Sequence, residues 1–246
     1  MLKAVIFDFD GVLADSEPIH YQAFQEVLGP LGLGHSYERY AEHFIGFDDR
    51  DAFREAFREA SRSLDEPTLA GLILAKSIAF RDIVARGVRP FPGAVALVHD
   101  LVQHRVPLAI ASGALHEDIR LILEVLFLES AFPIIVAADD VQRSKPDPET
   151  YQLAFERLQG RSGNNAFDRH NCLVIEDTAT GIQAAKKAGL FCVAVTHTAP
   201  ASSLAAADHV VTSLEQLNFQ VLVQVIHRHL AGEAASADGG IAGKSR

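Results

Sequence analysis

The sequence predicts an α/β fold: a doubly wound parallel sheet with helices on both faces and a helical domain inserted after the first strand. Two observations indicate this. Short apolar, largely β-branched runs alternate with segments of helical periodicity, an order typical of parallel strands joined by helices. Residues 16–86 interrupt the alternation, because they hold several amphipathic helical patterns and no convincing strand.

Six apolar runs are predicted strands, and helices are predicted between them. Apolar residues recur at helical spacing from Ile119 to Leu126, after the second run. Further helices are expected at Glu149–Leu158 and Gly181–Lys187, the latter ended by Gly189. The predicted strands are Ala4–Phe7, Leu108–Ala111, Ile134–Val136, Cys172–Ile175, Cys192–Val195 and His209–Val211.

The domain organisation follows from these elements. Residues 1–15 and 87–230 form the predicted α/β catalytic core, and residues 16–86 form a helical cap. Ligands of such sheets bind beyond the carboxyl ends of the strands, so a cap that directly follows the first strand is placed as a lid. Residues 231–246, rich in Ala, Gly and Ser, are expected to be a disordered tail.

Composition restricts the partners. The formal net charge is −10 and no long basic run occurs, which argues against nucleic acid or an anionic membrane but permits a phosphorylated metabolite in a local cationic pocket. Cys172 and Cys192 each open a strand-like run and are predicted to be small core residues. Because no signal pattern and no long apolar span is evident, we expect a cytoplasmic location. The expected oligomeric state is a monomer or weak dimer.

Chemistry-bearing side chains follow the predicted strands. They are Asp8 and Asp10 after the first strand, Ser112 after the second, Lys145 after the third, and Glu176 and Asp177 after the fourth. Parallel strands would bring them to one crevice, where clustered carboxylates repel one another unless a hard cation such as Mg²⁺ is present. A phosphoryl group suits such a site, because the cation and Lys145 offset its charge.

Two glycines fit the same interpretation. Gly11 permits a tight turn that brings backbone close to a phosphate. The backbone amide of Gly113, at the start of the helix that follows Ser112, can donate to a phosphate oxygen.

Four segments in order, "DFDGVLADSE", "ASG", "SKPDP" and "IEDTATGI", resemble the signature segments of the haloacid dehalogenase superfamily. The helical insert is similar to that of its β-phosphoglucomutase-like phosphatase branch. The resemblance covers about Lys3–Leu214 and is more specific than a lone Asp-x-Asp. It implies a Rossmann-like core with an α-helical cap, and a Mg²⁺-dependent enzyme acting on a small phosphorylated metabolite.

The resemblance also implies residue roles in the core. Asp8 matches the nucleophile that forms an aspartyl-phosphate, and Asp10 matches the general acid and then base. Ser112, Gly113 and Lys145 match the phosphate-binding positions.

The metal ligands implied by the resemblance overlap with these residues. They are the Asp8 side chain, the Asp10 main-chain carbonyl and Asp177. Glu176 is expected either as a further ligand or as a residue just behind the ligands.

Three cap residues are candidates for substrate specificity, each with a simpler alternative. His20 either contacts the substrate or only packs. Arg50 resembles a cap arginine that meets a distal phosphate in β-phosphoglucomutases, although Asp48 and Asp49 beside it would also form a surface ion pair. Lys76 has a counterpart in those mutases, but an exposed helical lysine is the commoner case.

The leading functional hypothesis is a phosphatase acting on a sugar phosphate through an aspartyl-phosphate. The alternative is a β-phosphoglucomutase-type mutase, which His20, Arg50 and Lys76 favour. Leu115 and His116 argue against it, because the mutases carry lysine and asparagine about there. A phospho-receiver signalling module is a more distant hypothesis, since such modules are about half as long and lack the insert.

Overall fold

The six predicted strands pair into one all-parallel sheet with the order β3-β2-β1-β4-β5-β6. The computed structural model describes residues 2–45, 47–161, 163 and 167–238. One end of β3, of β4 and of β5 differs by one residue from the prediction. The strands are β1 (Ala4–Phe7), β2 (Leu108–Ala111), β3 (Ile135–Val136), β4 (Cys172–Glu176), β5 (Phe191–Val195) and β6 (His209–Val211).

Two apolar clusters sandwich the sheet, and β1 shows why. Its side chains alternate between faces, so that Val5 and Phe7 join one cluster and Ala4 and Ile6 the other. The first cluster includes residues of α5 (Ala94–Gln103), α6 (His116–Val125) and α9 (Phe219–Asp238). The second includes residues of α7 (Glu149–Arg161) and α8 (Ala179–Lys187). This three-layer arrangement confirms the predicted Rossmann-like, doubly wound core.

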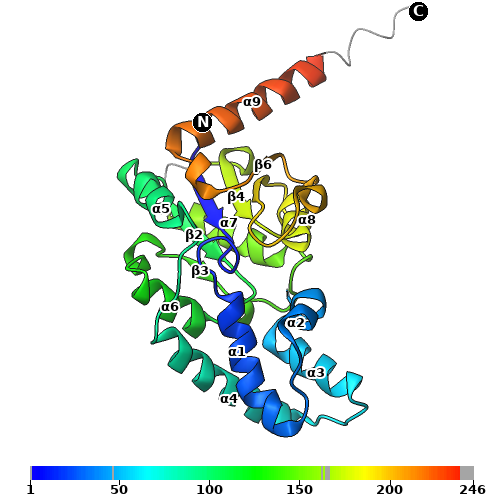
Figure 1. Ribbon diagram of the computed structural model, residues 1–246. Coiled ribbons are helices and arrows are strands. Elements are labelled where there is room, and N and C mark those ends of the chain that lie inside the picture. Colours follow the sequence, from blue (N-terminus) through cyan, green and yellow to red (C-terminus); the bar gives the residue numbers. More distant parts are fainter. Residues whose placement is uncertain (1, 46, 162, 164–166, 239–246) are drawn as a thin grey trace, which may run out of the picture.

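The secondary structure of the inserted segment, in its described part, consists of helices joined by loops and includes no strand, as predicted. Its helices are α1 (Glu17–Leu28), α2 (Tyr37–His43), α3 (Asp49–Glu59) and α4 (Glu66–Val84). They gather at one end of the molecule, opposite the end at which α9 extends (Figure 1). Aromatic residues such as Phe24, Phe53 and Phe57 form a third apolar cluster among them.

Side-chain caps explain where two of these helices begin. Asp48 accepts a hydrogen bond from the backbone amide of Asp51 at 2.8 Å, and Asp65 accepts one from that of Thr68 at 2.8 Å. Each carboxylate satisfies an amide that the first helical turn leaves without a partner. These caps fix the starts of α3 and α4.

The chain crosses between the sheet and the helical insert at one place. Ala14 forms an isolated antiparallel bridge with Pro90, and the backbone amide of Asp15 donates to the carbonyl of Arg89 at 2.9 Å. The outgoing and returning segments therefore run side by side, just beyond the carboxyl end of β1.

The C-terminal segment differs from the prediction. Residues 231–246 were expected to be a disordered tail, but α9 continues through Asp238; residues 239–246 lie outside the described part of the chain. Alanine has the highest helix propensity, so the Ala-rich composition that suggested disorder also extends a helix that Leu222 and Ile226 anchor in the core.

Both cysteines, Cys172 and Cys192, are buried and free, as predicted. Within the described residues, no helix has the length and apolar character needed to cross a membrane.

Candidate active site

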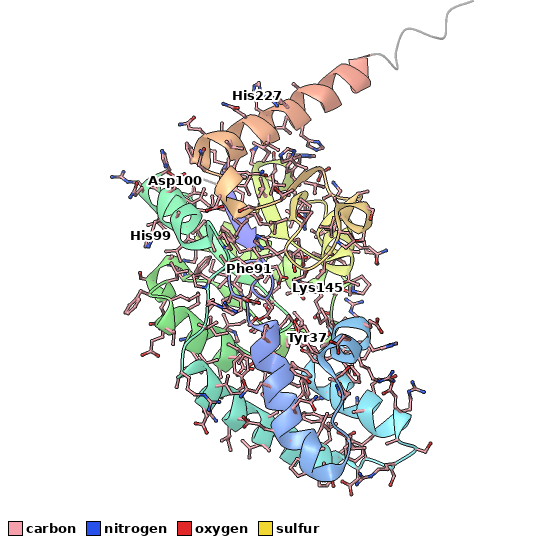
Figure 2. All side chains as sticks on the ribbon, viewed as in Figure 1. Tyr37, Phe91, His99, Asp100, Lys145 and His227 are labelled. Carbon is pink, nitrogen blue, oxygen red and sulfur yellow. The ribbon has the colours of Figure 1, made fainter. Side chains whose placement is uncertain are left out.

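A cavity of about 430 Å³ lies between the carboxyl ends of the strands and the helices of the insert. The predicted residues that line it are Asp8, Asp10, His20, Arg50, Ser112, Gly113, Lys145 and Asp177. Glu176 and Lys76 do not line it and are fully buried behind residues that do. Lys145 lies where the α/β core meets helices α1–α4 (Figure 2). The parallel strands thus bring together side chains that are far apart in sequence.

Lys145 is the central cation of the core side of this cavity. Its Nζ donates to Asp8 Oδ1 at 2.8 Å, to Glu176 Oε1 at 2.9 Å and to the Tyr151 hydroxyl at 3.0 Å. The Tyr151 hydroxyl in turn donates to Glu176 Oε1 at 2.9 Å. Three donations from one ammonium group fix its position, so Lys145 holds the Asp8 carboxylate in place and offsets its charge.

Glu176 supports this arrangement from behind. Its Oε2 accepts hydrogen bonds from the backbone amides of Asp177 and Thr178, each at 2.8 Å, and from the Thr178 hydroxyl at 2.9 Å. Burial alone would raise the pKa of Glu176, but the charge and hydrogen bond of Lys145 outweigh burial and lower that pKa. A Cβ atom on Gly181 would lie 1.5 Å from Glu176 Oε1. Glycine at this position therefore makes room for the glutamate.

Asp177 has an unsatisfied oxygen. Its Oδ2 accepts a hydrogen bond from the Thr198 hydroxyl, whereas its buried Oδ1 has no hydrogen-bond partner. Burial, followed by the charges of Glu176 and Asp8, raises its pKa well above the ordinary value. A buried carboxylate oxygen without a partner is costly in the absence of a cation.

The carboxylate group fits a hard divalent cation. Asp8, Glu176 and Asp177 each present one oxygen, and the three lie within 4.8 Å of one another. Burial raises the pKa of Asp8 to about 7, against the opposing effect of Lys145. Oxygen-only donors with excess negative charge suit Mg²⁺, and an acidic cluster of this kind is present at the predicted place.

Asp10 points in a different direction from Asp8. Its Oδ1 accepts a hydrogen bond from the Ser16 hydroxyl and lies 3.6 Å from His20 Nε2, and its Oδ2 accepts one from the Ser112 hydroxyl at 3.3 Å. Burial alone would raise the pKa of Asp10, but the proximity and charge of His20, together with the hydrogen bond from Ser16 and the charge of Lys76, outweigh burial and lower that pKa. The two aspartates are therefore separately held, and any metal contact of Asp10 through its main-chain carbonyl stays a prediction.

Gly11 is required for the close packing of the turn after β1 against Asp177. Its backbone φ is +78°, in the left-handed region that favours glycine. A Cβ atom there would lie 2.0 Å from Asp177 Oδ2. The glycine thus lets the turn after β1 approach the carboxylate cluster.

His20 and Lys76 form one unit on the cap side. Lys76 is fully buried, contrary to the exposed position that its residue type favours, and its Nζ lies 2.9 Å from His20 Nδ1 and 2.8 Å from Asp49 Oδ1. The His20 ring stacks on Phe80, with ring centroids 4.4 Å apart. Lys76 thus reaches the cavity through side chains that line it, namely His20, Asp49 and Asp118, whose Oδ2 lies 3.9 Å from Nζ.

Arg50 lies in the first turn of α3 and lines the cavity. The surface ion pair considered for it does not form in the described part of the chain: Asp48 caps α3 and Asp49 binds Lys76. The arginine is left available to a ligand.

Sequence reasoning missed several residues that complete the site. Thr198 follows β5 and lines the cavity, so the rule that selected polar residues beyond strand ends would have found it. Tyr151 carries no comparable signal, because its partner Glu176 lies on a different element. Ser16 is close to its partner Asp10 in sequence but does not directly follow a strand, so the same rule did not select it.

The comparisons with known proteins agree with this geometry. The family model described as haloacid dehalogenase-like hydrolase matches residues 5–195. The chain belongs to the haloacid dehalogenase-like hydrolase family. The predicted resemblance to this superfamily is confirmed.

Two relatives of this family are named phosphatases. The chain is 31% identical over 220 residues to validoxylamine A 7'-phosphate phosphatase of Streptomyces hygroscopicus subsp. limoneus, covering 89% of this chain and 97% of the relative. It is 33% identical over 196 residues to fructose-1-phosphate phosphatase of Escherichia coli strain K12, covering 78% and 95%.

A solved structure has the same fold. The crystal structure of β-phosphoglucomutase from Clostridium difficile matches with a TM-score of 0.81 over 94% of this chain and 100% of that one. Its sequence identity is 22%, so this likeness supports the capped fold and says nothing of substrate.

Proposed function

We propose that this haloacid dehalogenase-like hydrolase is a Mg²⁺-dependent phosphatase that cleaves a sugar phosphate, or a sugar-like phosphate, through an aspartyl-phosphate on Asp8. The observation that carries the proposal is that two carboxylates in one cavity are each held in place by different side chains. Asp8 is held by Lys145 at 2.8 Å, and Asp10 is held by Ser16 and Ser112. The phosphatase names of the relatives support it.

Asp8 is the nucleophile in this proposal. Its carboxylate attacks phosphorus, the ester P–O bond breaks, and the leaving oxygen takes a proton from Asp10. Water then attacks the phosphorus of the aspartyl-phosphate and gives a proton to Asp10, and the bond to Asp8 breaks to release phosphate. Ser112 and Gly113 donate to the phosphate oxygens during both steps, and the charge of Lys145 attracts the phosphate.

The electrostatics of Asp10 fit the second half of this cycle. Its lowered pKa keeps it a carboxylate, the form that accepts a proton from water. For the first half it must carry a proton. An anionic phosphate group entering beside it supplies the reason, because a nearby like charge raises a carboxyl pKa.

The metal would be held by Asp8 and Asp177, with Glu176 positioned behind them by Lys145 and Tyr151. When bound, the cation offsets the negative charge between the carboxylate and the phosphate. The partnerless Oδ1 of Asp177 is the atom that supports this assignment.

Phosphohexomutase activity is the second candidate, because His20 and Arg50 line the cap side of the cavity. The residues that follow Ser112 and Gly113 favour hydrolysis instead. Leu115 offers the cavity an apolar side chain, and His116 Nε2 lies 2.7 Å from Asp140 Oδ2 rather than lining the cavity. Neither supplies a second charged group for a phosphate.

The test is turnover with Mg²⁺ on p-nitrophenyl phosphate and on a panel that includes fructose 1-phosphate. We expect Asp8→Asn to lower kcat by at least about a thousandfold while the circular dichroism spectrum is kept. Asp15→Asn is the matched control, since Asp15 does not line the cavity. Substantial activity in Asp8→Asn would remove Asp8 as nucleophile.

β-Glucose 1-phosphate with a trace of the bisphosphate distinguishes the two candidates. Release of free phosphate supports the phosphatase. Rapid, bisphosphate-dependent formation of glucose 6-phosphate would make the chain a mutase.

A further inference from the structure

A second cavity, of about 380 Å³, lies at the β3 edge of the sheet. Arg120 and His116 line it from α6, Arg157 and Arg161 line it from α7, and the edge-strand segment 133–135 forms the remaining wall. None of these residues lines the active-site cavity. The two cavities are therefore separate sites.

The charge of the second cavity is opposite to that of the whole chain. Three guanidinium groups face it, although the formal net charge of the protein is −10. Guanidinium groups stay protonated at all physiological pH values. In an acidic protein, three of them around one small cavity indicate a specific anion rather than a general polyanion surface.

Only one of the three arginines is neutralised by the protein. Arg157 donates to the carbonyl of Ile135 at 2.9 Å and to Asp140 Oδ1 at 2.8 Å. Asp140 stays ionised, because hydrogen bonds from Arg157 and a backbone amide overcome burial and lower its pKa to about 2. Arg120 and Arg161 are exposed and form no ion pair with any described residue. Two guanidinium charges are thus left for a ligand.

We propose that this cavity binds a small anion bearing a phosphate or pyrophosphate group. Guanidinium forks match phosphate oxygens in pairs, which a point charge cannot do. Arg157 is held rigidly by Ile135 and Asp140, and the unpaired Arg120 and Arg161 approach from the two flanking helices. A volume of about 380 Å³ accommodates a small ligand. The inference does not depend on the reaction proposed for the first site.

The second site is connected to the loop that holds phosphate in the first. His116 follows the segment 112–115 that lines the active-site cavity. Its backbone amide donates to Asp139 Oδ1 at 3.2 Å, and its ring lies 2.7 Å from Asp140 Oδ2. An anion bound to Arg157 is thus connected, through Asp140, to His116, the first residue of α6.

The test uses methylenediphosphonate, a pyrophosphate analogue whose P–C–P bridge resists hydrolysis, and isothermal titration calorimetry on the full chain. We expect wild-type protein to show a class of binding that Arg120→Ala/Arg161→Ala weakens roughly tenfold or more, because charge-assisted contacts to two guanidinium groups are lost. Arg86→Ala/Arg228→Ala removes the same charge from two exposed arginines elsewhere and should leave the isotherm unchanged.

The circular dichroism spectrum and melting temperature of Arg120→Ala/Arg161→Ala verify that the variant is folded. Identical isotherms for wild type and this variant would overturn the proposal. Equal weakening in the Arg86/Arg228 control would also overturn it, since the effect would then reflect total charge alone.

Discussion

Lys76 Nζ lies 2.9 Å from His20 Nδ1, in the buried space between α4 and α1. An ammonium group can only donate, so Nδ1 of His20 accepts and Nε2 carries the ring proton. That proton faces Asp10 Oδ1, 3.6 Å away. Lys76 therefore fixes the His20 tautomer through which the cap contacts Asp10, the residue proposed to transfer the proton.

Lys76→Met tests this relationship. Without the ammonium donor, His20 is free to adopt the other tautomer and to turn an unprotonated nitrogen towards Asp10. We expect kcat to fall about ten- to a hundredfold, a part of what general acid–base catalysis contributes, with a smaller change in KM. Lys187→Met, at an exposed lysine, is the control. An unchanged kcat in folded Lys76→Met protein would refute the positioning role.

Gly181→Ala tests whether the position of Glu176 depends on the absence of a side chain at residue 181. The new Cβ would lie 1.5 Å from Glu176 Oε1, so the glutamate must move and release Lys145. We expect a loss of about 1–3 kcal/mol in the free energy of unfolding, measured by urea titration, together with reduced turnover. Gly71→Ala, on a helix with nothing within 4 Å, should be neutral or stabilising by up to about 1 kcal/mol. Equal behaviour of the two variants would contradict the prediction.

Asp118→Asn should stabilise the protein at neutral pH. Burial raises the Asp118 pKa to about 6, opposed by Lys76 and His20 and reinforced by the charges of Asp49 and Asp10. A raised carboxyl pKa means that stability is lost as pH rises from about 4, where the unfolded chain ionises, to about 6. The shift corresponds to about 3 kcal/mol. Thermal unfolding of the variant should therefore show a gain at pH 7.5 that disappears near pH 4; a pH-independent difference would exclude this cause.

Mg²⁺ should raise the melting temperature of the protein. A ligand at a hundred times its Kd stabilises by about 2.7 kcal/mol, and this corresponds to several degrees for a chain of this size. Asp177→Asn removes the carboxylate whose Oδ1 lacks a partner, and should abolish the shift. Asp82→Asn, at an exposed aspartate, should keep it. A shift reproduced by KCl at equal ionic strength would count against a specific site.

The sequence was most informative where local chemistry dictates structure. Two apolar runs end at acidic residues, Asp8 and the pair Glu176–Asp177, and parallel strands place such residues at one edge of the sheet. The sheet, the cap and the convergence of the core side chains could therefore be predicted.

Tertiary contacts explain what was missed. Lys76 is buried because Asp49 and Asp118, from two other helices, approach it, and nothing near Lys76 in the sequence signals them. The role of Tyr151 likewise depends on Glu176, which lies on another element. The extension of α9 was missed because composition alone does not separate an Ala-rich helix from an Ala-rich tail.

Ala14 and Pro90 keep the outgoing and returning chain together, so residues 16–86 are joined to the sheet through one narrow stem. A helical segment that replaces the present one has to end at that stem and to reproduce the apolar contacts that Ile19, Phe80 and Val84 make with the core cluster. New specificities can therefore arise by exchange of a whole module, and chimeras between relatives joined at this stem are a direct route to engineering them.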